Sequence, residues 1–355
     1  MLVVKSGEKS KGSTDLLKTW LYRLAGVFVS VLFVYLAVRK VDLSESLKVL
    51  ETVRPVLLGA AAVAYLVAFP VRALRWRLIL QAQKVFSWKE ILVPVFVGYM
   101  ANNLLPARTG EIYRAHFLGR RAQVSRSGVA ASIVVERTFD GLMLVVVILL
   151  VLVLFPHTAF LSGATFVTGL VFLTLAAFIL LYSFATDKSH RLVNRGLALL
   201  PRAIKERLRD RPEVFFRGIR GISTARDLAA ASGYTVCIWL LEACAIALVL
   251  ASFRVSVPLD GFVLVYALVA LSTTLPSGPG YVGPYQYAFV LSLGAFAISG
   301  ETALAVSVAA QLAFFGSVTA IGLTLLFREQ LRSGWYPNRG GSAPDESGPS
   351  EKKVG

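Results

Sequence analysis

Long apolar runs separated by short polar segments dominate the chain. The runs 142–155 and 166–184 contain no charged residue, and a helix of roughly 20 apolar residues is long enough to cross the hydrocarbon core of a bilayer. The pattern therefore predicts an all-α polytopic membrane protein. Full spans are expected at about 20–38, 55–72, 128–155, 163–184, 231–252 and 302–327.

Two further apolar stretches are shorter, and proline and glycine interrupt both. The stretch 91–105 ends at Pro106, and the stretch 261–275 ends at Pro276 before a second arm at 285–298. Both interruptions read Leu-Pro-x-x-x-Gly. Non-helical backbone at membrane depth is tolerated only where it is buried or lines a wet cavity, so the two tips predict a polar cavity. The tip residues are Pro106, Gly110, Pro276, Gly278, Gly280 and Gly283.

Basic residues indicate which segments lie in the cytoplasm, because loops rich in Lys and Arg stay on that side. They are concentrated in residues 1–19, 72–90, 114–126, 185–230 and 328–355. Both termini and both ends of the first broken pair are therefore predicted to be cytoplasmic. The linkers 156–162 and 253–258 carry little charge and are expected outside.

These orientations favour six full spans and two re-entrant hairpins, at about 91–121 and 259–298. The hairpins would enter from opposite faces, so that repeat 1 (about 20–155) and repeat 2 (about 163–327) form an inverted repeat. Many transporters place a site near the bilayer midplane in this way. Eight simple spans are the alternative.

The segments outside the transmembrane domain (20–327) and its large internal loop are polar. The N-terminus 1–19 is basic, and the loop 185–230 is expected to contain amphipathic helices that lie on the membrane surface. The C-terminal segment 328–355 is rich in Gly, Ser, Pro and charge and is expected to be a disordered tail.

Three charged residues lie inside the span 128–155, where each costs roughly 2.5–3.5 kcal/mol on insertion scales and usually faces a partner or a cavity. Glu136 and Asp140 are four residues apart and share a helix face, and Arg137 lies about 100° away. The set is an ion-pair lock, a headgroup or proton site, or a group exposed near the cytoplasmic surface. The expected partners on the first hairpin are Arg108, Glu111 and Arg114.

Further polar residues accompany the tips and the span 231–252. Glu242 lies near the middle of that span without a charged neighbour in sequence, and it is either a coupling-proton site or a structural hydrogen-bonding group. Asn102 and Asn103 at the first tip either satisfy the broken backbone or contact a ligand. The same alternatives hold at the second tip for Thr273, Thr274, Ser277 and Gln286.

Arg72, Arg75 and Arg77, with Trp76, close the expected second span. They are interpreted as anchors whose side chains snorkel to the membrane surface, and lipid-phosphate binding is the alternative.

Several classes of function are disfavoured. The net charge is +16, but the basic residues flank apolar spans, so anionic lipid headgroups rather than nucleic acid are their expected partners. Cys237 and Cys244 lie in one apolar segment, where a packing role is expected. The three histidines show no metal-ligand spacing, and no catalytic triad is recognisable, so neither a metal nor a cofactor is expected.

The order of these motifs resembles the flippase-like family. This is the transmembrane region of lysylphosphatidylglycerol synthases (multiple peptide resistance factors), which also occurs in stand-alone proteins. In bifunctional members, this region is implicated in moving aminoacylated phospholipid between leaflets, and a soluble C-terminal domain makes that lipid. The resemblance covers about residues 20–327 and rests on Asn102-Asn103-Leu104-Leu105-Pro106, Arg108, Gly110-Glu111, Arg114, Glu136-Arg137, Asp140, Leu275-Pro276-Ser277-Gly278-Pro279-Gly280 and Gly283.

The resemblance implies a lipid transporter or flippase of the plasma membrane, with membrane lipids as its partners. The lipid would be anionic, aminoacylated or linked to polyprenyl phosphate. Because few residues follow the last expected span, no synthase domain is expected and an enzymatic role is disfavoured. The alternatives are a membrane-embedded transferase acting on a lipid-linked substrate, and a scaffold for a lipid-modifying enzyme.

Overall fold

The computed structural model describes residues 27–105, 109–154, 221–275 and 277–333, and in these residues the regular elements are helices. Three long helices are α3 (Pro55–Leu80), α6 (Arg126–Leu154) and α11 (Ala225–Ser252). A fourth runs through α14 (Gly300–Gln311), the π-helical turn η3 (Leu312–Gly316) and α15 (Ser317–Ser333). All four are long and apolar enough to cross a membrane.

Shorter helices complete the described part of the chain. The apolar helix Val27–Val38 covers part of the predicted first span. The predicted span 163–184, most of the loop 185–230 and the tail from residue 334 lie outside the described residues.

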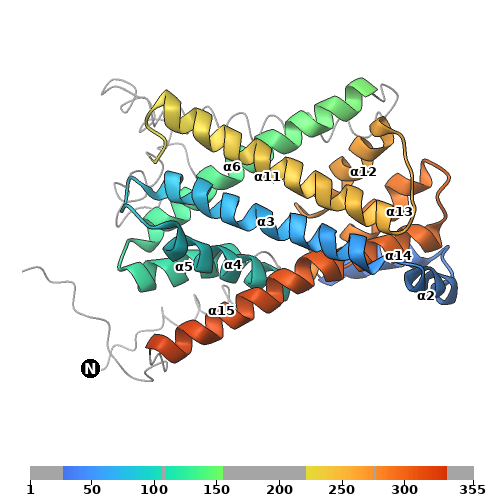
Figure 1. Cartoon of the computed structure of the whole chain (residues 1–355), viewed down its shortest axis with the longest axis horizontal. Coiled ribbons are helices and arrows are strands. Elements are labelled where there is room, and N and C mark those ends of the chain that lie inside the picture. The colour runs from blue at the N-terminus through green and yellow to red at the C-terminus, as the bar shows by residue number, and fades with distance from the viewer. Residues whose placement is uncertain (1–26, 106–108, 155–220, 276, 334–355) are drawn as a thin grey trace, which may run out of the picture.

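Two pairs of shorter helices stand at the predicted breaks. The first pair is α4 (Trp88–Leu104) and α5 (Gly110–Ala122), and the second is α12 (Leu259–Ser272) and α13 (Pro284–Gly294), with the 3₁₀ turn η2 (Pro279–Tyr281) between its arms. The arms of each pair pack on each other. Figure 1 shows the two pairs towards opposite ends of the bundle of long helices.

The long helices hold the two pairs in place. α3 and α11 pack along much of their length in the middle of the bundle (Figure 1). In the first pair, α4 packs on α15 and α5 packs on α6. In the second pair, α12 packs on α6 and α13 packs on α14. Buried apolar side chains form one large cluster around each pair.

Glycine allows the arms of the first pair to approach closely. A Cβ atom added at Gly110 would collide with the carbonyl oxygen of Gly98 and with the backbone nitrogen of Asn102. A Cβ atom at Gly98 would lie 2.8 Å from Cδ of Arg114. The two glycines therefore let α5 rest on α4 and let the Arg114 side chain cross it.

The second break needs glycine for a different reason. Gly280 and Gly283 have φ values of +66° and +100°, a region that residues with a Cβ atom rarely adopt. Gly283 also lies against the Ser30 backbone oxygen, and the Gly278 amide donates to Ser30 Oγ at 2.8 Å. The second tip is thereby fixed to the helix Val27–Val38.

One short helix was not predicted from the sequence. α2 (Leu43–Glu51) begins after Asp42, whose carboxylate accepts from the Ser44 and Glu45 amides as an N-cap, and it packs on α14. The signals that predict it are the capping Asp42 and the spacing of Leu43, Leu47 and Leu50.

Two of the predicted spans end too early. α3 continues to Leu80 rather than ending at residue 72, and α15 continues to Ser333 rather than ending at residue 327. The arginines of α3 suggested a membrane surface, whereas the structure pairs two of them inside the bundle, and the helix continues.

Candidate functional site

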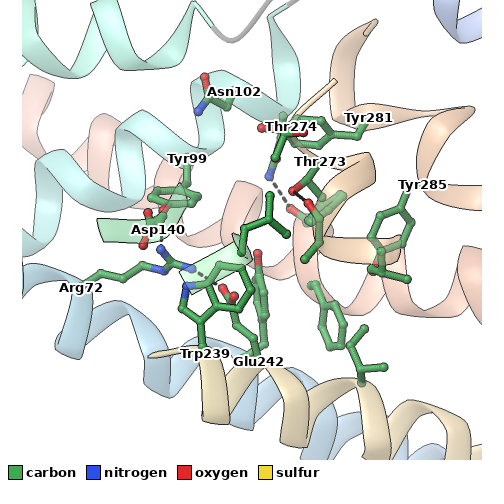
Figure 2. Close-up of a pocket in the computed structure, with 18 of the residues that line it drawn as sticks. Arg72, Tyr99, Asn102, Asp140, Trp239, Glu242, Thr273, Thr274, Tyr281 and Tyr285 are labelled. Carbon is green, nitrogen blue, oxygen red and sulfur yellow. Dashed lines mark hydrogen bonds and ion pairs between the residues drawn. The ribbon is translucent and has the colours of Figure 1, made fainter. Parts of the chain in front are cut away.

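A cavity of about 350 Å³ lies where the two broken pairs meet. The first tip contributes Asn102 and Asn103, and the second contributes Thr273, Thr274 and Tyr281. Figure 2 shows polar side chains from both tips on one side of this space and Arg72, Asp140 and Glu242 on another. The remaining lining residues come from α3, α4, α5, α6, α11, α12, α13 and the π turn, and they include Tyr65, Tyr99, Trp239, Tyr266, Tyr285, Phe314 and Phe315.

A cluster of eight charged side chains borders the cavity and extends behind it. We call this the charged cluster, and four arginines in it face four carboxylates. Burying an unpaired charge is very costly. Eight charged side chains can therefore lie inside a helix bundle only because positive and negative charges are equal in number and paired. The members are Arg72, Arg75, Arg114, Arg137, Glu111, Glu136, Asp140 and Glu242.

Glu136 is the centre of the charged cluster and has no exposed surface. Its carboxylate lies 2.9 Å from Arg114 Nη2, 2.9 Å from Arg137 Nη2 and 3.5 Å from Arg75 Nη2. It thereby links α6 to α5 and to α3. Glu136 does not line the cavity. Because it is buried and has three cationic partners, we interpret it as a structural residue behind the cavity wall.

Arg75 joins three helices through one guanidinium group. Its Nη1 lies 2.6 Å from Asp140 Oδ1 and donates to Thr235 Oγ1 at 2.9 Å, while its Nη2 lies 3.2 Å from Asp140 Oδ2. The planar fork of arginine suits this two-point contact with a carboxylate. α3, α6 and α11 are therefore connected at this residue.

Arg114 contacts both Glu136 and the ring of Trp76. Its guanidinium carbon lies 3.5 Å from the ring centre of Trp76, and the indole of Trp76 donates to Ser132 Oγ at 3.0 Å. A cation above an indole ring is attracted by the ring's electron density. Trp76 is consequently a buried support for Arg114 and, through it, for the charged cluster.

Arg72 faces the cavity and binds across the α3–α11 interface. It forms an ion pair with Glu242 and donates to the Tyr99 hydroxyl at 2.6 Å. Tyr99 also accepts from Arg137 Nη2 at 3.2 Å. Figure 2 shows Arg72, Tyr99, Asp140 and Glu242 around one end of the cavity.

Both tips are hydrogen-bonded to the fourth long helix at or beside its π turn. Asn103 Nδ2 donates to the Phe315 carbonyl oxygen at 3.2 Å and to Thr319 Oγ1 at 3.1 Å. Gln311 Nε2 donates to the Gly280 carbonyl oxygen at 2.6 Å, and Gln286 Nε2 donates to Gln311 Oε1 at 2.6 Å. A π turn interrupts the α-helical hydrogen-bond ladder and is frequent at functional sites. Here Phe315 lies within the turn, and Gln311 and Thr319 lie close to its two ends.

Comparison with known proteins identifies the chain. The family model described as the lysylphosphatidylglycerol synthase TM region matches residues 23–322. The chain belongs to this family. A UPF0104 membrane protein of Methanothermobacter thermautotrophicus is 23% identical over 287 residues, which cover 77% of this chain and 85% of the relative. The chain is accordingly a multi-pass membrane protein.

Two further relatives of this lysylphosphatidylglycerol synthase TM-region protein match over shorter parts. The glycosyltransferase AglD of Haloferax volcanii is 35% identical over 118 residues, which are 33% of this chain and 19% of AglD. A UPF0104 membrane protein of Methanocaldococcus jannaschii is 25% identical over 137 residues, 38% of this chain and 41% of that protein. No solved structure matches the chain.

The structure brings most of the predicted polar residues of this family member together. The predicted approach of the first hairpin to α6 is confirmed for Arg114, which contacts Glu136, and for Glu111, which lies 3.5 Å from Arg137 Nε. Arg108, Pro106 and Pro276 lie outside the described residues. Asn102, Asn103, Arg137, Asp140 and Glu242 line the cavity, whereas Glu136 and Arg114 lie behind it.

The structure corrects the interpretation of Arg72 and Arg75 as surface anchors. Arg72 is 6% exposed and Arg75 is fully buried, while Arg77 is exposed. The spacing of three residues, which puts Arg72 and Arg75 on one helix face, could have indicated a buried pair. The aromatic lining was also missed, because its members come from elements far apart in the sequence.

Two smaller expectations also have an outcome. Cys237 and Cys244 are exposed on α11, so their predicted packing role is wrong. Ser277 is buried, and its hydroxyl has no hydrogen-bond partner among the described residues. Among all the residues that the structure describes, no group of three or more His, Cys, Asp or Glu residues could hold a metal ion.

Proposed function

We propose that the protein transports a lipid between the leaflets of the plasma membrane, with the headgroup passing through the cavity between the two tips. The cavity carries the proposal, because charged, amide and hydroxyl side chains are among those that line it, it lies inside a bundle of membrane-spanning length, and both breaks contribute to its wall. Its volume of about 350 Å³ is at the lower end of the roughly 300–1,000 Å³ typical of ligand pockets. It suits a headgroup, with the apolar tails left in the bilayer.

An inverted repeat with two re-entrant hairpins fits the packing. In repeat 1, α3, the α4–α5 pair and α6 follow one another, and in repeat 2 the corresponding elements are α11, the α12–α13 pair and α14–α15. The contacts correspond as well, since α4 packs on α15 where α12 packs on α6, and α5 packs on α6 where α13 packs on α14. A Cβ atom at Gly280 would lie 3.6 Å from the Asn103 carbonyl oxygen, so the flanks of the two tips are in contact.

The distribution of charge favours one orientation of the bundle. Arg77 lies near the end of α3, Lys84 lies between α3 and α4, and Arg120 and Arg121 lie near the end of α5. Basic segments stay in the cytoplasm. We place these residues, and both termini, on the cytoplasmic side. The second pair then enters from outside.

A reconstitution assay tests transport. Purified protein in liposomes should move fluorescent lipids from the outer to the inner leaflet faster than protein-free liposomes do, measured by chemical quenching of the outer leaflet. Thr274→Trp should slow this movement because the indole would fill the cavity that Thr274 lines. Thr324→Trp is the matched control, since Thr324 is an exposed threonine on α15 that does not line the cavity. Equal rates with and without wild-type protein, across anionic, zwitterionic and glycosylated lipids, would refute the transport proposal.

Thiol labelling tests the hairpins separately. In a background with Cys237→Ala and Cys244→Ala, Asn102→Cys and Thr274→Cys should react with small water-soluble reagents from the same side, because both residues line one cavity. With eight simple spans, the tips would be at opposite membrane surfaces and the two cysteines would react from opposite sides. That outcome would refute the inverted hairpins while leaving transport open.

A transferase acting on a lipid-linked substrate is the second candidate, and the partial similarity to the glycosyltransferase AglD favours it. Such an enzyme would use a carboxylate as general base, and of the three carboxylates on α5 and α6 in the charged cluster, Glu111 and Asp140 line the cavity and Glu136 does not. A base must reach the proton it abstracts, so Glu111 and Asp140 are the candidates. A lipid product of changed mass, formed with donor and wild-type protein but not with Glu111→Gln or Asp140→Asn, would favour this function over transport.

A further inference from the structure

We infer that the headgroup taken into the cavity is a sugar, so that the substrate class is a lipid-linked carbohydrate. This inference rests on the proposed transport function. It follows from two properties of the cavity wall, the aromatic side chains and the balance of charge, which together match the surface chemistry of a sugar ring.

Aromatic residues make up an unusually large part of the lining. Eight of the 22 lining residues are Tyr, Trp or Phe, and they come from both halves of the chain. The face of an aromatic ring is electron-rich, so it attracts the C–H groups on the faces of a sugar ring, which carry a small positive charge. Among the labelled residues, Tyr99, Trp239, Tyr281 and Tyr285 surround the cavity in Figure 2.

Some of these rings are already oriented by other groups. Tyr266 donates its hydroxyl to the Trp239 carbonyl oxygen at 2.9 Å, and the two rings meet edge to face with centres 5.7 Å apart. Tyr65 stacks on Phe314 at 4.6 Å. A wall that is fixed before the ligand arrives loses little conformational entropy on binding.

The charges of the wall favour a neutral, hydroxyl-rich group over a strongly anionic one. Among the described lining residues, the cations Arg72 and Arg137 are both paired, with Glu242 and with Glu111 and Asp140 respectively. These two cations face three carboxylates, so this part of the wall offers no surplus positive charge to a headgroup rich in phosphate. Paired carboxylates and guanidinium groups remain good partners for hydroxyls, which both donate and accept.

The amide and hydroxyl groups of the tips complete the same chemistry. Asn102, Asn103, Thr273 and Thr274 line the same cavity. Aromatic rings to stack on, together with amide, hydroxyl and charged groups, form a site for a ring that has hydroxyls around its edge. An acyl chain would offer no hydrogen-bond partner to Asn102, whose buried Oδ1 has none among the described residues.

The test compares headgroups in one assay. Phosphatidylcholine liposomes containing the wild-type protein receive traces of fluorescent glucosylceramide, fluorescent phosphatidylglycerol or fluorescent phosphatidylcholine, and leaflet exchange is measured for each. The sugar lipid should move at least about tenfold faster than either phospholipid, a difference that one or two aromatic contacts can supply.

A variant locates the effect in the cavity. Trp239→Leu should slow the movement of glucosylceramide by about two- to tenfold, the contribution of one aromatic contact, and Trp239→Phe should slow it less. Trp88→Leu is the control, because Trp88 is exposed at the start of α4 and does not line the cavity. The comparison of headgroups in the wild-type protein stands even if Trp239→Leu does not fold.

The outcomes separate this inference from transport itself. Equal rates for all three lipids, or faster movement of phosphatidylglycerol, would overturn the sugar inference and leave transport intact. A fluorescent aminoacylated phosphatidylglycerol that moves faster than glucosylceramide would also overturn it. If no lipid moves in the presence of the wild-type protein, the transport proposal and the sugar inference fall together.

Discussion

The ion pair between Arg72 and Glu242 gives the sharpest prediction, because it decides between the two readings of Glu242. The pair joins α3 to α11, and residues 227–253 around Glu242 contain no Lys or Arg. If Glu242 is a structural partner, Glu242→Gln should destabilise the protein by leaving Arg72 buried without its carboxylate. If it is only a proton site, stability should change little.

The magnitude follows from the burial of the pair. Removing one partner of a fully buried pair costs about 3–5 kcal/mol, whereas an exposed pair contributes about 0–1 kcal/mol. The Arg72 side chain is 7% exposed and the Glu242 side chain is 21% exposed. We therefore expect Glu242→Gln and Arg72→Met each to lower the free energy of unfolding by about 2–4 kcal/mol. The double substitution Arg72→Met with Glu242→Gln should cost less than the sum of the two single losses, because no charge is left unpaired.

The assay is the thermal stability of the four purified proteins in one detergent, followed by size-exclusion chromatography after heating. Glu45→Gln is the control, since Glu45 pairs with Lys48 on α2 with more than half of each side chain exposed, and it should change stability by less than about 1 kcal/mol. Losses in the two single variants that add fully in the double variant would show that the residues do not interact, and would refute the reasoning.

Three further predictions concern the supports of the cavity. Gly110→Ala should abolish the monodisperse folded protein, because its Cβ would collide with the Gly98 carbonyl oxygen, whereas Gly59→Ala on α3 has open space around its Cβ and should fold normally; equal yields would contradict the close approach of α4 and α5. Arg75→Lys should cost about 1–3 kcal/mol, since one ammonium group cannot hold Asp140 at two points and Thr235 as well, while Arg77→Lys on the exposed face should stay within about 0.5 kcal/mol. Gln311→Leu removes the hydrogen bonds to Gly280 and Gln286 and should speed amide hydrogen exchange in residues 278–284 without changing it in α3, whereas unchanged exchange at the second tip would show that Gln311 does not hold it.

The helical class and the places of the breaks could be predicted from the sequence. The cost of moving a segment into a bilayer depends on the side chains of that segment alone, so apolar runs indicate α6 and α11 without knowledge of the neighbours. Proline and glycine act just as locally. The break before Gly110 and the left-handed residues Gly280 and Gly283 follow from residue type.

The positions of the charged residues in the site could be predicted only in part. Glu111, Arg114 and the α6 charges belong to segments adjacent in the chain, so their approach could be predicted. Arg72 and Glu242 are 170 positions apart, and the spacing of Arg72 and Arg75 on α3 indicates a shared helix face without identifying the carboxylates that this face meets. The end of α3 was misplaced for that reason.

The sequence by itself therefore determined which segments are apolar helices, where two of them break and which residues permit the break. The tertiary structure alone decided which charges are neutralised, how far α3 extends, and that aromatic rings from both halves face one cavity. The physical reason is the range of the interactions, since helix formation and membrane insertion depend on neighbours along the chain. An ion pair or a cavity wall instead depends on side chains that only packing brings within a few ångströms of each other.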